Sequence, residues 1–528
     1  MPIRFRIFRV WCLLILIGLG CLVCLGCGGA GGGEPDGGAA DGQVDDGGQD
    51  AGADGEADAG SDGGDAGDPD AGDEEAVLEA IALSPASLEV EEGMTRRVSA
   101  SGSYSDGQER DVTAEVSWVL EPDAPVEIAT GLLTALRPGQ TTVRARIGAI
   151  TSDDLAVTVQ PHAAYEARGL WVTRWNYASA EDVRRIVAAA AAAGFNQLYF
   201  QVRGTADAYY ASSVEPWAAG LSGALGRDPG WDPLQVALDE AHGAGMELHA
   251  WINTVPAWSC ALDAPVSEGI PHVLELHPEW SAVDANGVPM LGNCADGYVF
   301  LSPGNPAVHD HIRAVVQDLV TAYALDGVHL DYIRYPGTRF SHDPVSEQRY
   351  AEAVAAEPGL AWEDWQRRQI NALVGGVYET LATHRPAAVL SAAVWFIRIN
   401  VWGWSAVSEG FHQYFQDPRA WCQAGTIDAI VPMIYFGLTD PPGGRLDFAS
   451  MLQDHLDGAA GRHVYAGIHG DYDDFGEIAA QFNTSRQLGA RGMVIFAYPY
   501  LVEHAYFDDL AEGPLAEPVL GTPGRPWR

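Results

Sequence analysis

The sequence predicts an α/β protein in which a (β/α)8 barrel of the TIM type follows a small all-β sandwich. Three observations carry this prediction. After Tyr165, eight apolar segments alternate with helical runs, as in a closed parallel barrel. Residues 76–160 show period-two alternation between turn residues. An acidic tract over 28–75 separates both regions from an apolar N-terminus. The predicted boundaries are 1–27, 28–75, 76–160, 161–515 and a C-terminal tail at 516–528.

The N-terminus has the layout of a signal peptide. Three arginines precede an apolar run from about residue 10 to residue 25, which is short for a membrane span. The cysteine that ends residues 1–27 resembles the lipidated cysteine of bacterial lipoproteins. Cys27 is the expected lipidation site, with Cys21 as a competing site and plain secretion as the alternative. The expected location is the cell envelope, with a lipid anchor in the outer membrane.

Residues 28–75 form a strongly acidic tract. They include 12 Asp and 4 Glu, no positive charge and only Val44 as a large aliphatic residue. Such a segment has too little apolar surface to form a core, and its charges repel one another. We expect a disordered linker.

Charge and composition exclude several functions. The formal net charge is -42, and no basic stripe interrupts it, so nucleic acid is not an expected partner. All 30 basic residues are arginine. A P-loop and Schiff-base chemistry both require a lysine, so neither is expected.

The region 76–160 predicts a small antiparallel sandwich. Its alternating segments, such as 142–147, are separated by Gly and Pro turns. The runs VSW at 116 and GLLTALRPGQTTVRA at 131 resemble the bacterial immunoglobulin-like group 2 domain. That resemblance implies a spacer or an adhesive support.

Eight apolar segments are the predicted barrel strands. They are GLWVTRWN at 169, NQLYFQVR at 196, MELHAWIN at 246, GVHLDYI at 327, AVLSAAVWFI at 388, DAIVPMIYF at 428, HVYAGIHG at 463 and GMVIFAYPY at 492. Helices are expected over 180–193, 232–243, 305–324 and 362–384. The alternative, a doubly wound open sheet, is disfavoured because no G-x-G-x-x-G follows the first strand.

Polar residues at the ends of these strands are the candidate site, because barrel active sites lie where strands end. The strand ends carry Arg174, Asn176, Arg203, Asp207, His249, Trp251, Asn253, His329, Asp331, Arg334, Trp395, Tyr435, His469, Asp471 and Asp473. Strand residues two apart share a face, so His329 and Asp331 should both point inward. A carboxylate flanked by histidines and aromatic rings suits sugar chemistry. Asp326 and Asp428, at strand beginnings, are expected to be structural.

Several longer motifs occur in order between about 165 and 510. They are RGLWVTRWNY, FQVRGTADAYY, EPWAAGLSG, WDPLQVALDEAHGAGMELHAWIN, HPEW, SPGNPAV, DGVHLDYIRYP and IDAIVPMIYF. Together they resemble glycosyl-hydrolase-like family 10, which is similar to other (β/α)8 glycosidases. The resemblance implies a glycoside hydrolase acting on a bacterial cell-wall glycan or another polysaccharide. Its pattern singles out Arg203, Asp207, His249, Asn253 and Asp331.

Asp331 and Asp207 are the expected catalytic residues. Asp331 resembles the fourth-strand nucleophile of amylase-like barrels, and the D-x-E pair of chitinase-type barrels is absent. Asp207 is the expected general acid, with Glu215, Asp440 and Asp471 in reserve. Expected substrate-binding residues are Arg203, His249, Trp251, Asn253, His329, Arg334, Trp395 and Tyr435.

Two other functions stay open at this point. One is a carbohydrate-binding lipoprotein whose barrel is catalytically inactive. The other is a metal-dependent hydrolase using His249, His329 and Asp331, which the missing first-strand H-x-H disfavours. We expect no metal or cofactor. The expected partners are a glycan substrate and a membrane, contacted through the lipid anchor. Cys260 and Cys294 either pair or stay free.

Overall fold

The computed structural model describes residues 76–294, 297–405, 407–438 and 446–528. The expected signal peptide with Cys27, the acidic linker and the reserve residue Asp440 lie outside the described residues. Among the helices that are described, none combines the length and apolar character needed to cross a membrane.

The N-terminal region is an all-β domain, as predicted. Its sheets have the strand orders β1-β4-β5, β10-β9-β11-β2 with β6 on β9, and β3-β8-β7. All pairs are antiparallel except β11 with β2. The strands are β1 (Leu78–Ser84), β2 (Ser87–Glu91), β3 (Thr95–Arg97), β4 (Ser99–Tyr104), β5 (Glu109–Asp111), β6 (Ser117–Leu120), β7 (Val126–Ala129), β8 (Leu132–Ala135), β9 (Gly139–Ile147), β10 (Ile150–Thr151) and β11 (Leu155–Gln160).

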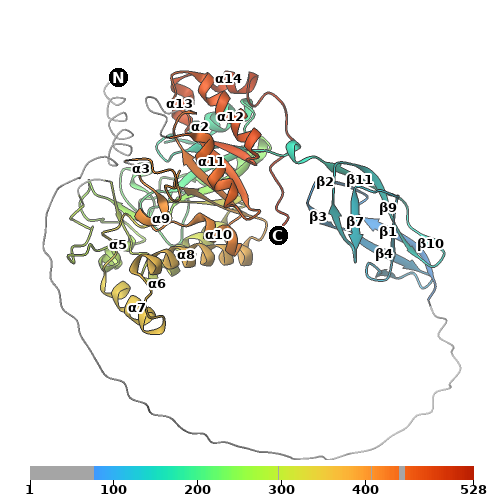
Figure 1. The fold of residues 1–528 in the computed structure, drawn as a ribbon, viewed down its shortest axis with the longest axis horizontal. Helices are drawn as coiled ribbons and strands as arrows, with labels where there is room; N and C mark the ends of the chain where they lie inside the picture. The colour runs from blue at the N-terminus through green and yellow to red at the C-terminus, as the bar shows by residue number, and fades with distance from the viewer. Residues whose placement is uncertain (1–75, 295–296, 406, 439–445) are drawn as a thin grey trace, which may run out of the picture.

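The second domain is a closed eight-stranded parallel barrel surrounded by helices (Figure 1). Its strands are β12 (Ala167–Val172), β13 (Gln197–Arg203), β14 (Glu247–Asn253), β17 (Gly327–Asp331), β18 (Val389–Val394), β19 (Ala429–Ile434), β20 (His463–His469) and β21 (Gly492–Phe496). Each strand overlaps one of the eight segments selected from the sequence. The predicted (β/α)8 barrel is therefore confirmed.

The four predicted helices form with boundaries close to those expected. They are α2 (Ala180–Ala192), α4 (Pro233–Gly243), α6 (Pro306–Ala322) and α8 (Trp362–His384). Side chains of Ser179, Asp232 and Asn305 cap the first three by accepting backbone N–H groups. The remaining helices of the barrel domain are α3 (Ala219–Ser222), α5 (Val273–Leu276), α7 (Pro344–Ala356), α9 (Gly410–Gln413), α10 (Pro418–Ala424), α11 (Phe448–Asp457), α12 (Phe475–Leu488), α13 (Tyr498–Glu503) and α14 (Phe507–Glu512).

A long excursion between β14 and α6 covers part of the barrel mouth. It contains the hairpin β15 (Pro256–Ser259) and β16 (Tyr298–Phe300), α5, and the 3-10 turn η2 (Pro278–Trp280). A Cys260–Cys294 disulfide, which the sequence left open, ties the two hairpin arms together. The excursion has a small apolar core of its own that includes Val255, Leu274 and Leu301.

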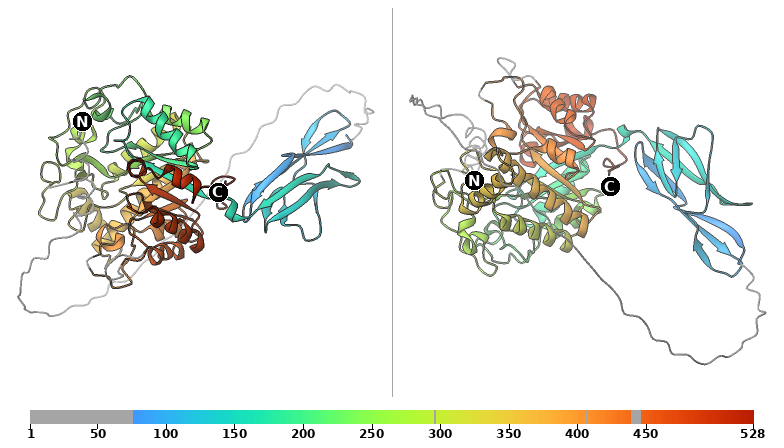
Figure 2. Two further views of the ribbon diagram at one scale, coloured as in Figure 1. Left: turned by 90° about the horizontal axis from the view of Figure 1, so that it is seen from above. Right: turned by 60° about the horizontal axis from the view of Figure 1, so that its bottom comes forward.

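The all-β domain joins the barrel at the end where the strands begin. The link runs through η1 (His162–Ala164) directly into β12. Glu91 of β2 is buried, accepts hydrogen bonds from Arg491 and the Gly524 N–H (2.9 Å), and contacts His162 Nδ1 (2.7 Å). The C-terminus lies on this side of the barrel, between the two domains (Figures 1 and 2). The barrel mouth therefore faces away from the all-β domain.

The C-terminal tail seals the barrel floor. Trp527 Nε1 (2.8 Å) and the Arg528 guanidinium donate to the fully buried carboxylate of Asp428. Asp428 also accepts the Leu390 N–H at 2.8 Å, and Asp326 accepts the Leu248 N–H at 2.9 Å. Both aspartates thus have the structural surroundings expected of them.

Candidate active site

The middle of the barrel is filled by aromatic and imidazole rings. His249 of β14 and His329 of β17 are fully buried. The strand register pairs His249 with Gly327, and a Cβ atom at Gly327 would lie 2.2 Å from His249 Nδ1. Gly327 therefore makes the space that His249 occupies inside the barrel. His249 reaches down to Glu247 Oε2 (3.2 Å), away from the mouth.

His329 is held by two hydrogen bonds that fix its tautomer. Its Nε2 accepts from Trp171 Nε1 at 3.2 Å, so Nδ1 carries the proton and donates to Ser391 Oγ at 2.9 Å. Burial lowers the pKa of His329 well below its ordinary value, which keeps the ring neutral. The expected substrate contacts of His249 and His329 are not compatible with this burial. Both rings support the mouth from below.

Arg203 is also structural. It is fully buried and forms a two-pronged ion pair with Glu215 at 2.8 Å for both bonds. Its Nη1 donates to the carbonyls of Asn253 and Thr254. The Asn253 amide in turn bridges Gln201 Nε2 (3.1 Å) and the Gly204 carbonyl (3.1 Å). The substrate contacts expected of Arg203 and Asn253 are therefore replaced by contacts that hold the loop after β13.

Asp331 lies at the top of β17 with its carboxylate almost enclosed. The Tyr332 N–H donates to its Oδ1 at 2.6 Å. Burial raises the pKa of Asp331, while the Arg334 charge, the Tyr332 N–H and the Trp251 indole act in the opposite direction. Trp251, an expected substrate-binding residue, is 5% exposed, so its ring is not open for stacking on a sugar.

Asp207 lies in the turn after β13. Its Oδ1 accepts from the Thr205 N–H (2.7 Å) and the Thr205 hydroxyl (3.2 Å). The charge of Asp207 raises the pKa values of several groups near it, among them Arg174, Tyr209 and Tyr177. Asp207 follows β13 and Asp331 ends β17, and one strand, β14, lies between these two strands in the barrel.

Each candidate carboxylate lies next to a strained backbone position. Ala206 precedes Asp207 with φ 54°, and Tyr332 follows Asp331 with φ 50°. A non-glycine residue in this left-handed region costs roughly 1–3 kcal/mol and is enriched at functional sites. Neither residue is a glycine or an asparagine, so these two conformations could not be predicted from the residue types.

Aromatic rings form the accessible rim above Asp331. Trp395 and Tyr435, both expected at the site, are half-buried at the ends of β18 and β19. Arg334 lies between the rings of Tyr332 (4.3 Å) and Trp395 (5.0 Å). Trp175, which we did not select from the sequence, is 53% exposed beside Arg174. Its position directly after a selected strand-end arginine was the available signal.

The reserve acids fit less well. Arg203 and His311 lower the pKa of Glu215 to about 2 despite its burial, so Glu215 cannot hold a proton for donation near neutral pH. Asp471 is exposed and contacts His504 Nε2 at 2.9 Å. Among the reserves, only Asp440 lies outside the described residues.

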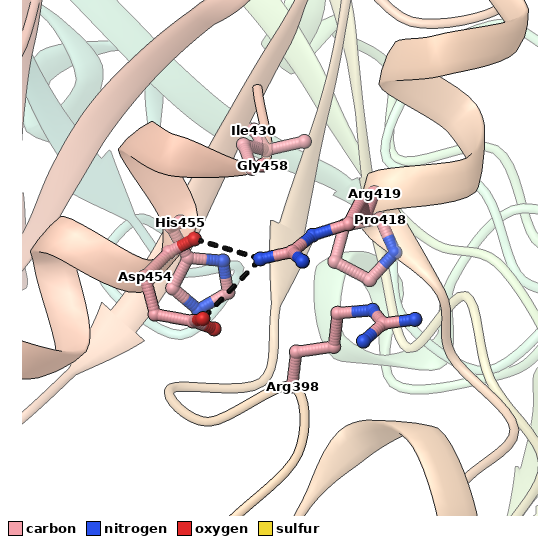
Figure 3. A pocket seen from close by; sticks show the side chains of 7 residues that line it. All are labelled: Arg398, Pro418, Arg419, Ile430, Asp454, His455 and Gly458. Atoms are coloured by element: carbon pink, nitrogen blue, oxygen red, sulfur yellow. Dashed lines mark hydrogen bonds and ion pairs between the residues drawn. The ribbon is translucent and has the colours of Figure 1, made fainter. Parts of the chain in front are cut away.

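No group of three or more His, Cys, Asp or Glu side chains suited to a metal ion occurs in the described part of the chain. A small cavity of about 10 Å³ lies on the barrel flank between α10 and α11, where Arg419 donates to Asp454 at 3.2 Å (Figure 3). It holds no more than a water molecule, and none of the candidate residues lines it.

Two family models match the chain in order. The model described as "Bacterial Ig-like domain (group 2)" matches residues 77–159. The model described as "Glycosyl hydrolase-like 10" matches residues 166–471. These matches cover the two regions in which the sequence motifs were found.

Two relatives are described as glycosyl hydrolases. "Glycosyl hydrolase DigH" of Escherichia coli (strain K12) is 31% identical over 258 residues, which are 46% of this chain and 55% of that protein. "Glycosyl hydrolase YngK" of Bacillus subtilis (strain 168) is 28% identical over 356 residues, which are 63% of this chain and 66% of that protein. The chain thus spans about half to two thirds of the length of these relatives.

Among solved structures, the PgaB (BpsB) glycoside hydrolase domain from Bordetella bronchiseptica is similar. Its TM-score is 0.49 at 15% identity, and the match covers 65% of this chain and 98% of that domain.

Proposed function

The chain belongs to the glycosyl hydrolase-like 10 family, and on this premise we propose that it is an exported glycoside hydrolase. Its substrate is a bacterial cell-wall glycan or another polysaccharide, and Asp331 and Asp207 carry the chemistry. The observation that carries the proposal is the arrangement of carboxylates and aromatic rings at the barrel mouth. A nearly enclosed carboxylate lies beneath an aromatic rim, with a second carboxylate in the turn after β13.

The two carboxylates have different surroundings, which suggests how they divide the work. Burial raises the pKa of Asp331, a property of a group that keeps its proton until a leaving group needs it. Asp207 accepts two hydrogen bonds from Thr205 and lies beside the Arg174 charge. We therefore assign proton donation to Asp331, and the role of base or nucleophile to Asp207. This reverses the roles expected from the resemblance of Asp331 to the amylase-like nucleophile and from the motif position of Asp207.

The function is tested by incubating the full chain with purified glycans. The panel contains peptidoglycan strands with and without stem peptides and a set of neutral and acidic polysaccharides, with products identified by mass. Shortened glycans that are absent from an Asp331→Asn digest support the proposal. Glycan binding without any product would identify the inactive carbohydrate-binding alternative.

The all-β domain is expected to be dispensable for the chemistry. A protein that begins at Pro161 keeps every candidate mouth residue, because the domain contacts the opposite end of the barrel. Its turnover on a soluble glycan should match that of the full chain, although Arg491 loses Glu91 as a partner. Turnover and thermal unfolding are measured on both proteins. A folded truncation with low turnover would place part of the site in the all-β domain.

The lipid anchor is tested at Cys27. Replacement of Cys27 by Ser removes the thiol that would carry the lipid, so the protein should move from the membrane fraction to the soluble fraction. Fractionation followed by immunoblotting measures this, with Cys21→Ser as the matched control. Membrane retention of the Cys27→Ser protein without accumulation of an unprocessed form would contradict the assignment.

A further inference from the structure

We propose that Arg174 and Arg334 form a subsite for a carboxylate on the glycan, so that the enzyme prefers acidic glycans over neutral ones. This inference rests on the proposed function, because it concerns the same mouth. It starts from how the described part of the chain treats its buried arginines.

Five arginines are buried among the described residues, and three of them are neutralised within the chain. Arg168 pairs with Glu166 (2.8 Å), Arg203 with Glu215 (2.8 Å), and Arg367 with Asp364. For Arg174 and Arg334, by contrast, no carboxylate of the described residues lies within 4.0 Å. Each of the two lies within electrostatic range of a candidate carboxylate, Asp207 for Arg174 and Asp331 for Arg334, without forming an ion pair with it. Burying a charge that has no close counter-charge is costly, so a carboxylate on the ligand would stabilise both guanidiniums.

Each of these two guanidiniums also has one buried nitrogen without a hydrogen-bond partner among the described residues. Nη1 of Arg174 and Nη1 of Arg334 are buried N–H groups without an acceptor in the described structure. Arg174 otherwise donates to the Tyr298 hydroxyl at 3.2 Å, and Arg334 is sandwiched by aromatic rings. The two Nη1 atoms are two of fifteen buried side-chain atoms without a partner among the described residues, and both belong to arginines at the mouth. A carboxylate, which accepts several N–H groups at once, satisfies both donors.

The two arginines converge on one place in the mouth. The rings of Tyr298 and Tyr332 pack edge to face at 5.5 Å, and Arg174 contacts the first while Arg334 covers the second. The positive charges of both guanidiniums lower the pKa of the Tyr332 hydroxyl against the effect of burial. Tyr332 directly follows Asp331 in the chain. A carboxylate bound here would therefore belong to the sugar at, or next to, the bond that Asp331 serves.

The local structure keeps Arg174 in this place. A Cβ atom at Gly204 would lie 2.4 Å from Arg174 Nε, so the missing side chain provides the slot for the guanidinium. The exposed Trp175 ring lies over the same guanidinium at 4.0 Å.

The test measures binding, separately from turnover, on the full-length Asp331→Asn protein by calorimetry. The probes are peptidoglycan strands stripped of stem peptides, the same strands with their carboxylates amidated, oligogalacturonate, and chitin hexasaccharide as the neutral probe. The first and third probes distinguish a wall carboxylate from a uronate. Arg174→Gln, Arg334→Gln and Gly204→Ala are each added to this background. Arg313→Gln, an arginine on the outer helix α6, is the matched control.

We expect at least one carboxylate probe to bind about 10- to 100-fold more tightly than the amidated or neutral probe. Each of the three mouth variants should remove most of that preference and leave binding of the neutral probe unchanged, while Arg313→Gln keeps it. Gly204→Ala retains the charge and displaces it, so its effect separates position from charge.

Equal binding of acidic and neutral probes would overturn the carboxylate subsite and leave the glycosidase proposal intact. A preference for acidic probes that survives all three mouth variants would overturn the assignment to these arginines. Failure of every glycan to bind or to be cleaved would overturn the proposed function, and this inference with it.

Discussion

Turnover of the Asp331→Asn protein is expected to fall by roughly 10²- to 10⁴-fold, the range for loss of a positioned acid or base. The amide has almost the same volume as the acid and keeps an oxygen that accepts the Tyr332 N–H. Fold and glycan binding should therefore stay nearly unchanged. The substitution replaces the titratable carboxyl group with an amide that cannot transfer the proton.

The role of Asp331 is tested by changing the leaving group of the substrate. If Asp331 donates a proton, an aryl glycoside with an acidic phenol should restore much of the lost rate, because its departure needs no protonation. The wild-type rate on a natural glycan should also decline as the pH rises through the raised pKa of Asp331. For Asp207→Asn the same aryl substrate should bring no rescue.

An aspartate on an outer helix provides the matched control for Asp331→Asn. Asp239→Asn makes the same chemical change on the outer helix α4, where Asp239 accepts from Gln235 at 2.8 Å. Its turnover should equal that of the wild type. An Asp331→Asn protein with near-normal turnover would refute the assignment, and rescue in the Asp207 variant instead would return the roles to those expected from the sequence.

The second large effect is expected on stability, at Glu215. Glu215→Gln leaves the fully buried Arg203 without its counter-charge and weakens the contact of His311 Nε2 (2.9 Å). Removing one partner from a buried ion pair costs about 3–5 kcal/mol. The free energy of unfolding should fall by this amount, measured by denaturant titration of the barrel transition.

The same pair predicts an acid-dependent loss of stability. Arg203 and His311 lower the pKa of Glu215 from 4.5 to about 2, which corresponds to about 3 kcal/mol. Because the folded-state pKa is the lower one, this stabilisation is fully present above pH 4.5 and is lost as the pH falls toward 2. The Glu215→Gln protein should lack this part of the acid response.

Glu268→Gln serves as the control for Glu215. Glu268 pairs with Arg227 on the surface, where both side chains are more than half exposed. Solvent screens such a pair, so its loss should change the unfolding free energy little. Equal effects of the Glu215 and Glu268 substitutions would show that the buried pair does not hold the loop after β13.

The barrel was predictable because its pattern is local and repeated. Apolar runs such as 327–331 and 492–496 are buried on both faces, and helix caps such as Asp232 and Asn305 mark where the intervening helices begin. The strand-end rule also placed Asp331, Arg334, Trp395 and Tyr435 at the mouth. Each of these positions follows from where a strand ends.

The depth at which each polar side chain lies along the barrel axis was not predictable from the sequence. His249 and Asn253 share the inward face of β14 with Trp251, yet His249 bonds toward the floor and Asn253 is saturated by Gln201 and Gly204. The sequence shows that two residues share a face. It does not show which of them meets a neighbouring strand's side chain, and Arg203 was misjudged for the same reason.

The sequence by itself determined the domain order, the eight strands and the family motifs, because these depend on periodicity and on residues close together in the chain. Only the tertiary structure decided which polar groups are neutralised. Glu215 lies twelve residues after Arg203 and forms an ion pair with it, whereas Arg174 and Arg334 form no ion pair with a described carboxylate. Electrostatic pairing depends on distances of a few ångströms between segments far apart in sequence, and those distances exist only once the barrel has closed.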